Sequence, residues 1–217
     1  MSSLTIPPRD VHVAALEPSQ LAEAAGGLAR AFVPDPAFTS LWPDAARRGR
    51  ALERLMAVPV THALRHGHVD ALAVAGTLAG VAAWLPPGRY PLGTREQLRA
   101  VPRMLGVAAA APRAFPRLGR FGANIDAAFP ADRPWYLAVV GVVPEAQGRG
   151  LGTRLMHPGL DRCDAAAGDC YLETDTASAA RLYERLGFAT LEAGAQLLPG
   201  GPTHWRMRRP AGGASST

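Results

Sequence analysis

A glycine-rich turn between a strand and a helix is the feature that most constrains this chain. Residues 134–143 read PWYLAVVGVV, an apolar run of strand length that is typical of a central strand buried on both faces. Three glycines follow within five positions, at Gly148, Gly150 and Gly152, and a helical pattern then continues to about Ala167. The sequence therefore predicts a strand, a turn with little side-chain cover, and a helix.

The bare turn predicts an anion site. The first N–H groups of a helix have no helical partner and carry the positive end of its dipole. Glycine lets a pyrophosphate approach these amides and permits unusual dihedral angles. Arg149 and Arg154 can add positive charge at the rim. A glycine turn without any ligand is the alternative interpretation.

Two familiar phosphate-binding patterns do not fit. The dinucleotide fingerprint G-x-G-x-x-G would need glycine at position 153, which is Thr153, and the P-loop needs a lysine, which the chain lacks. The missing lysine also excludes a Schiff base to pyridoxal phosphate. The remaining pattern is Q-x-x-G-x-G, from Gln147 to Gly152.

The rest of the chain interleaves helices and strands. Helical patterns run from Leu21 to a break at Pro34–Pro36, from about Asp44 to His66 with a kink at Pro59, and over 178–187. A mobile cover of short helical pieces is expected over 94–128, divided by Pro102, Pro112 and Pro116. Further strands are expected at 10–16, 68–76, 77–86, 170–174, 188–193 and 203–209. This order predicts a mixed α/β fold.

Composition argues against two classes of binding partner. The net charge is +5 and all 23 basic residues are arginine, but they are scattered and aromatics are only 6%, so a nucleic-acid partner is not expected. No apolar run approaches the length of a membrane span, so no membrane partner is expected. Two cysteines and the lack of a signal-peptide pattern favour a cytoplasmic protein.

Two motifs resemble those of the GCN5-related N-acetyltransferase (GNAT) superfamily. Gln147–Gly152 matches its (Q/R)-x-x-G-x-(G/A) motif, and ARLYERLGF at 180–188 is similar to its closing helix and strand. The resemblance implies a GNAT fold, with a mostly antiparallel central sheet, a splayed parallel strand pair and flanking helices. Residues 1–210 would form a single domain, followed by a disordered tail at 211–217. Within the superfamily, residues 135–188 and THWRMRRP at 203–210 resemble the puromycin N-acetyltransferases.

The resemblance implies acetyl-CoA as cosubstrate and assigns residues to it. The strand edge at Val140, Gly141 and Val142 would bind the pantetheine arm like an added strand. Thr176, where many relatives carry asparagine, would also contact the cofactor. The pyrophosphate would lie on the turn formed by Gln147, Gly148, Arg149, Gly150, Leu151, Gly152 and Thr153.

Tyr183 and Glu173 are the predicted catalytic residues. A phenol with a pKa of about 10 can protonate a departing thiolate, although a core aromatic would occupy the same helix position as Tyr183. Glu173 lies in an apolar strand and could deprotonate the incoming ammonium, or simply pair with an arginine. Asp175 and Glu184 are alternative bases with weaker placement.

The remaining candidates are weaker. Cys163 and Cys170 are expected to be inert buried thiols, because neither has a histidine next to it in sequence. His66 and His68 lack a third ligand, so no metal is expected. Pro158 should kink the helix after the turn. Trp42 and Trp84 could line an acceptor pocket or belong to the core.

The resemblance implies direct acetyl transfer, within a ternary complex, to a primary amine of a small molecule such as an antibiotic or an aminonucleoside. Two alternatives stay open: a peptide or protein amino group as acceptor, and a non-catalytic regulatory protein that binds acyl-CoA. The protein would be a monomer or a homodimer.

Overall fold

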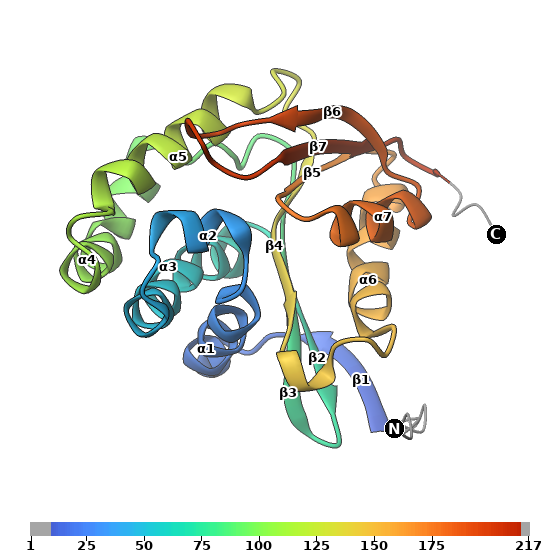
Figure 1. Ribbon diagram of the computed structural model, residues 1–217. Coiled ribbons are helices and arrows are strands. Elements are labelled where there is room, and N and C mark those ends of the chain that lie inside the picture. The colour runs from blue at the N-terminus through green and yellow to red at the C-terminus, as the bar shows by residue number, and fades with distance from the viewer. Residues whose placement is uncertain (1–9, 214–217) are drawn as a thin grey trace.

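The computed structural model describes residues 10–213, which form one seven-stranded sheet with helices on both faces (Figure 1). The strands are β1 (Val11–Ala15), β2 (His68–Val74), β3 (Thr77–Leu85), β4 (Trp135–Val142), β5 (Cys170–Thr174), β6 (Ala189–Ala195) and β7 (His204–Arg209). The helices are α1 (Leu21–Phe32), α2 (Pro36–Leu41), α3 (Ala45–His66), α4 (Thr94–Ala110), α5 (Phe115–Ala128), α6 (Leu151–Ala165) and α7 (Ala177–Arg185), with short 3₁₀ turns at Pro18–Gln20 and Pro144–Ala146. The predicted mixed α/β fold is confirmed.

The order of strands is β1-β2-β3-β4-β5-β7-β6, and every neighbouring pair except β4 and β5 is antiparallel. The parallel pair is in register only where Trp135 meets Cys170 and Tyr136 meets Tyr171. Beyond these residues β4 continues to pair with β3, up to Val142 opposite Gly80. The edge of β4 that faces β5 is therefore open, which confirms the predicted splayed strand pair.

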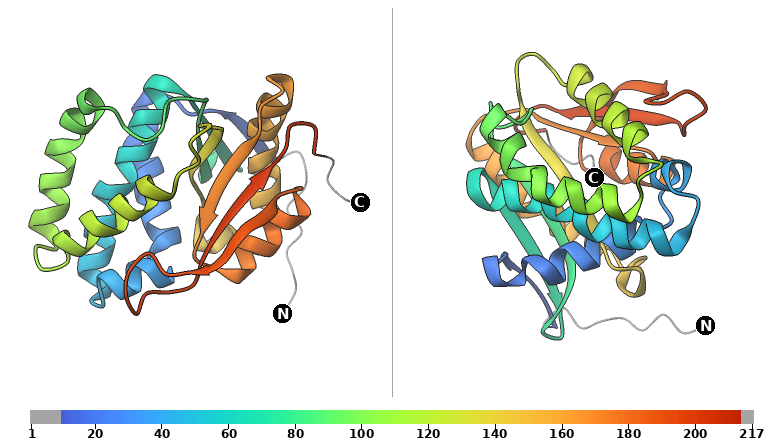
Figure 2. Two further views of the ribbon diagram at one scale, coloured as in Figure 1. Left: turned by 90° about the horizontal axis from the view of Figure 1, so that it is seen from above. Right: turned by 90° about the vertical axis from the view of Figure 1, so that its left-hand side faces the viewer.

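The two faces of the sheet have separate cores. Helices α1 to α5 lie on one side and α6 and α7 on the other (Figure 1), and from one side α4 and α5 lie in front of α3 (Figure 2). Leu28 and Leu52 belong to the first core, and Trp84 and Met156 to the second. A Cβ at Gly159 would lie 2.0 Å from the Trp84 indole, so glycine is required where α6 crosses the sheet. Trp42 is also buried, so both tryptophans belong to the core and not to an acceptor pocket.

Proline positions explain where the predicted helices were wrong. Pro102 does not divide the chain, because α4 continues through it, as α3 and α6 continue through Pro59 and Pro158. An internal proline removes one helical hydrogen bond and its ring crowds the preceding turn, but the packing of the helix can compensate for this. Pro116 lies in the first turn of α5, where its missing N–H has no helical partner in any case.

The break expected at Pro34–Pro36 contains the start of a helix. Asp35 caps α2 by accepting hydrogen bonds from the N–H groups of Ala37 and Phe38, and Pro36 takes the first helical position. Aspartate followed by proline is a helix-start signal as well as a turn signal. The predicted break at Pro34–Pro36 took account of the turn signal alone.

Strand burial also differs from expectation in one place. Residues 135–137 and Val139 of β4 are buried, but Ala138, Val140, Gly141 and Val142 are only half-buried, because they border an open cavity. The start of the tail expected at 211–217 is ordered, because the N–H groups of Ala211 and Gly212 donate hydrogen bonds to Asp169 and Asp164. Residues 214–217 lie outside the described residues. Between residues 10 and 213, no helix combines the length and apolarity that a membrane crossing requires.

Candidate active site

A cavity of about 700 Å³ lies where β4 and β5 separate. Its walls come from the open edge of β4, the ends of β5 and α1, the start of α7, and side chains of α2, α3 and α5. Helix α5 is tied to the β6–β7 connection by a hydrogen bond from Asn124 Nδ2 to the carbonyl of Leu197. The cavity therefore has a floor of strands and a wall of helices on the α1–α5 side of the sheet.

The glycine turn lies at one end of this cavity. Gly148 and Gly150 have φ of +75° and +73°, in the left-handed region that favours glycine, and a Cβ at either position would meet nothing within 4 Å. Gly150 is the N-cap of α6 and offers no side chain to the first N–H groups of that helix. The side-chain amide of Gln147 donates to the carbonyl of Val142 at 2.8 Å and so fixes the turn to the end of β4.

Only some of the predicted cofactor residues line the cavity. Val140, Gly141, Val142, Gln147 and Thr176 do so. The rest of the turn continues beyond Gln147 and does not line it: Gly148, Arg149, Gly150, Leu151, Gly152 and Thr153. Their placement fits a ligand that extends out of the cavity onto the start of α6.

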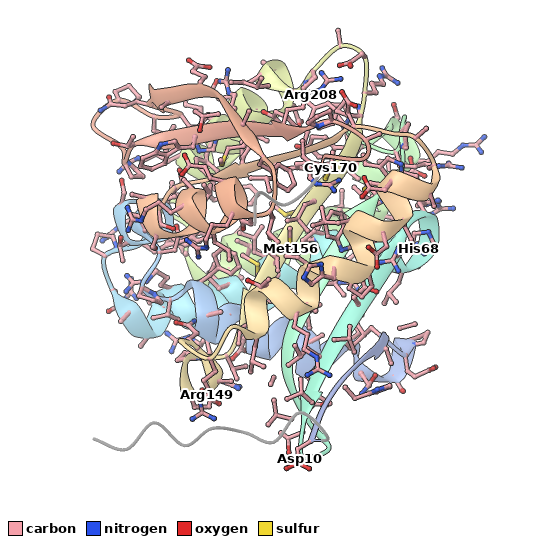
Figure 3. The ribbon with its side chains drawn as sticks, turned by 90° about the vertical axis from the view of Figure 1, so that its right-hand side faces the viewer. Asp10, His68, Arg149, Met156, Cys170 and Arg208 are labelled. Atoms are coloured by element: carbon pink, nitrogen blue, oxygen red, sulfur yellow. The ribbon has the colours of Figure 1, made fainter. Side chains whose placement is uncertain are left out.

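Three side chains of this segment have distinct surroundings. The Leu151 side chain is buried in the second core, which leaves only its backbone for a ligand. Arg149 is exposed and points outward at the turn (Figure 3). Arg154 was expected as a rim charge, but its guanidinium donates to the carbonyl of Val11 at 2.6 Å, so it joins α6 to β1 instead.

Tyr183 reaches the cavity from α7. Its side chain is 6% exposed, lines the cavity and packs edge-on against Phe188, with ring centroids 5.9 Å apart. Burial raises the pKa of the hydroxyl well above its ordinary value, because the charged phenolate would lack solvation. The phenol is therefore neutral at physiological pH and retains a proton that it could donate.

Glu173 lines the cavity near the end of β5. Its side chain is only 6% exposed, and it accepts a hydrogen bond of 2.8 Å from the hydroxyl of Tyr171. Within residues 10–213 no arginine pairs with it; Arg206, its cross-strand neighbour, pairs with Glu192. The arginine-pair alternative for Glu173 is thus not what the structure contains.

His204 and Asp175 form a second pair beside Glu173. His204 is 2% exposed; its Nδ1 lies 2.8 Å from Asp175 Oδ1, and its Nε2 lies 3.9 Å from Glu173 Oε1. Burial opposes charge on this imidazole, but the hydrogen bond to Asp175 and the nearby Glu173 carboxylate raise its pKa to about 9. An imidazolium between two carboxylates is the result at neutral pH.

Asp35 is a further acid on the cavity wall. Burial and the negative charge of Asp175 raise the pKa of Asp35 to about 6, against the two backbone N–H groups that it caps. Neither Asp35 nor His204 was among the predicted site residues. A lone histidine at the start of a strand, and an aspartate between two prolines, give no sign that they meet across the fold.

The other candidates lie away from the cavity. Glu184 is exposed on α7 and does not line it. Cys163 and Cys170 are fully buried on the opposite side of the sheet, and burial raises the pKa of the Cys170 thiol. His66 packs against His62, whereas His68 stacks on Trp135. Across residues 10–213 no group of three or more His, Cys, Asp or Glu side chains is arranged to hold a metal ion.

A family model matches the segment of the chain that forms most of this site. Residues 118–190 match the acetyltransferase (GNAT) domain, and this range includes the splayed strand pair, the glycine turn and Tyr183. The match covers 73 of the 217 residues, so it is this segment that is similar to a GNAT acetyltransferase domain. Solved structures share the fold over the rest of the chain.

Individual curated relatives match only a short segment of the chain. The chain is 47% identical to a mycothiol acetyltransferase of Streptomyces griseus over 57 residues, which cover 25% of this chain and 19% of the relative. It is 41% identical to that of Mycobacterium leprae over 81 residues, which cover 34% of this chain and 25% of the relative. The matched segments thus span a quarter or less of these curated relatives.

Solved structures match over almost the whole chain. A histone acetyltransferase-related protein from Corynebacterium glutamicum has a TM-score of 0.69 and 24% identity, covering 93% of this chain and 97% of its own. A putative acetyltransferase from Salmonella typhimurium, solved with acetyl-CoA, has a TM-score of 0.54 and 14% identity, covering 95% and 97%. At these identities the likeness establishes the fold.

Proposed function

We propose that this chain transfers an acetyl group from acetyl-CoA to a primary amine of a small molecule. One observation carries the proposal. A single cavity joins Gln147 and the open edge of β4, which suit a coenzyme, to Tyr183 and Glu173, which suit the transfer of protons.

The residues present fit acetyl-CoA, which would supply the activated acetyl thioester. The N–H groups at the start of α6 suit its pyrophosphate, and nothing would cover a ligand at Gly148 or Gly150. The unpaired edge of β4 from Ala138 to Val142 suits the amide groups of the pantetheine arm. Thr176 makes no side-chain cap to α7, so its hydroxyl is available to the ligand in place of the asparagine of many relatives.

Glu173 and Tyr183 divide the proton transfers between them. Glu173 accepts a proton from the bound ammonium, which leaves a neutral amine to attack the thioester carbon. As the carbon–sulfur bond breaks, Tyr183 gives its proton to the leaving sulfur and regains one from the nitrogen that has become bonded to the acetyl carbon. The products are the amide and free coenzyme A, and Glu173 then releases its proton to solvent. Neither Cys163 nor Cys170 lines the cavity, so direct transfer is favoured over an acyl-cysteine intermediate.

A small acceptor suits the cavity better than a protein chain. Helix α5 lies over one wall and is tied to Leu197, which leaves limited room for an extended peptide. The resemblance to puromycin N-acetyltransferases favours an antibiotic or aminonucleoside acceptor, and hence a role in antibiotic resistance. A cytoplasmic location and a monomer or homodimer complete the proposal.

Release of free thiol from acetyl-CoA, measured with a panel of amines, tests this function. We expect turnover with small primary amines, and Tyr183→Phe should lower kcat by about 10²- to 10⁴-fold because the proton donor is lost. Turnover with peptides alone would overturn the choice of acceptor. Binding of acetyl-CoA without turnover on any amine would favour the regulatory alternative.

A further inference from the structure

The charge of the cavity is opposite to that of the chain. The chain has a net charge of +5 and 23 arginines, yet no arginine of the described residues lines the cavity. Four carboxylates do line it, those of Asp35, Asp126, Glu173 and Asp175, whereas its basic groups are His62 and His204. Such a separation of charge attracts cations into the site and repels anions.

The walls between these carboxylates are apolar and rich in aromatic rings. The chain has fourteen aromatic side chains, and six of them line the cavity: Phe32, Phe38, Tyr90, Phe121, Tyr136 and Tyr183. Phe38 packs against Phe32 at 5.9 Å and Phe121 at 6.4 Å between ring centroids. Aromatic faces attract cations and also bury flat apolar groups.

Each of the four carboxylates has one oxygen that is hydrogen-bonded within the described chain. The hydroxyl of Tyr90 donates to Asp126, the hydroxyl of Tyr171 donates to Glu173, and His204 pairs with Asp175. Asp35 differs because its donors are two backbone N–H groups, both bonded to Oδ1, and no side chain of the described residues pairs with its carboxylate. Within the described chain, Oδ2 of Asp35 accepts no hydrogen bond, although the residue lines the cavity beside Phe38.

We propose that the acceptor is a cationic amine with an apolar, ring-containing body and no acidic group, and that Asp35 is a specificity-determining residue that binds its ammonium. This inference rests on the proposed function. An ammonium buried in apolar surroundings needs a counter-charge, and the free oxygen of Asp35 supplies one. A carboxylate or phosphate on the acceptor would be repelled by the four acids, and no arginine is present to offset it.

Matched amines with and without a carboxylate test the inference at pH 7. Phenethylamine and phenylalanine share a ring and an ammonium, as do tryptamine and tryptophan, and each pair differs by one carboxylate. Their affinities are measured by calorimetry with coenzyme A present. Each amine should bind at least ~10-fold more tightly than its amino acid, because like charges repel in a buried site. Equal affinity within both pairs, or no binding of either amine, overturns the inference.

Two variants separate the charge of Asp35 from its role as a helix cap. Asp35→Asn keeps an efficient N-cap but removes the charge, and should weaken phenethylamine binding by ~10-fold or more. Asp44→Asn is the matched control, because Asp44 caps α3 in the same way but is exposed and lies outside the cavity. Unchanged affinity in Asp35→Asn would contradict the role of Asp35.

The same assays keep the two proposals apart. Selective binding of the amines without any thiol release would sink the proposed acetyl transfer and leave the inference standing. Thiol release that is as fast with phenylalanine as with phenethylamine would support acetyl transfer and contradict the proposed selectivity for amines without an acidic group.

Discussion

At the scale of single residues, the ionisation of the site is set by neighbours that are distant in sequence. His204 is buried, which alone would keep its imidazole neutral, but Asp175 and Glu173 face it and raise its pKa to about 9. The same Asp175 carboxylate, together with burial, raises the pKa of Asp35 to about 6. The imidazolium therefore lies between two of the four carboxylates that line the cavity.

The stability of the protein should depend on pH through His204. Its folded pKa of about 9 lies above the ordinary value of 6.5, so its contribution is complete below pH 6.5 and is lost as pH rises through 9. A difference of this size corresponds to roughly 3 kcal/mol. Urea unfolding from pH 6 to pH 10 should show this loss in the parent protein and not in His204→Gln. Parallel pH profiles for the two proteins would contradict the ionic role of His204.

Exchange of Glu173 for glutamine tests which carboxylate takes the proton. Glu173→Gln should lower kcat/KM by about 10²- to 10⁴-fold while acetyl-CoA still binds. Glu184→Gln is the control on the neighbouring helix, because Glu184 is exposed and outside the cavity. A large loss in Glu184→Gln, or none in Glu173→Gln, would reverse the assignment.

The cofactor residues could be predicted from sequence better than the acceptor residues. Gln147, Gly148 and Gly150 belong to one short motif, so their local order is enough to indicate a bare turn before a helix. Asp35 and His204 are 169 positions apart and line the same cavity, His204 from β7, which lies between β5 and β6, and Asp35 from the start of α2. Sequence patterns of single elements contain no information on such a meeting.

At the scale of elements, two structures make the site: the strand pair that separates and the turn that follows β4. Pairing of β4 and β5 stops after Tyr136, and this opens the edge of β4 where the coenzyme is proposed to bind. Gly148 and Gly150 then bring the chain into α6 with left-handed dihedral angles. The site thus depends on backbone groups more than on side chains.

A methyl group at Gly150 should weaken coenzyme binding. Gly150 has φ +73°, so Gly150→Ala should cost about 1–2 kcal/mol of stability and also place a Cβ where the pyrophosphate is proposed to lie. Gly76 has φ +80° in the β2–β3 turn, with the same open surroundings, and does not line the cavity. Thermal unfolding should show similar losses for both variants, whereas calorimetry should show weaker acetyl-CoA binding only in Gly150→Ala. Equal coenzyme affinity in the two variants would refute the proposed contact.

Most of the elements could be predicted, because their apolar residues recur at helical spacing or form short continuous runs typical of buried strands. The hairpin of β2 and β3 and helices α1, α3, α6 and α7 are of this kind. The errors concern Pro102 and the Pro34–Pro36 segment. Proline was expected to break a helix at both places, but Pro102 lies within α4 and Pro36 begins α2. Whether proline interrupts a helix or begins one is decided by packing and capping, which depend on the rest of the fold.

At the scale of the whole molecule, one sheet separates two cores and brings two kinds of site together. The cavity on the α1–α5 side contains the acids and aromatic rings, and the glycine turn at its end leads to α6 on the other side. Arginines give the chain its net charge of +5, but those of the described residues lie outside the cavity. The proposed anion site on backbone amides thus lies beside a cavity that is proposed to bind a cation.

Titration calorimetry of acetyl-CoA into the purified protein tests the central claim most directly. The account predicts one saturable site per chain, with binding that competes with coenzyme A because the turn contacts the part that the two molecules share. No saturable heat at millimolar acetyl-CoA, from protein that unfolds cooperatively, would contradict the account.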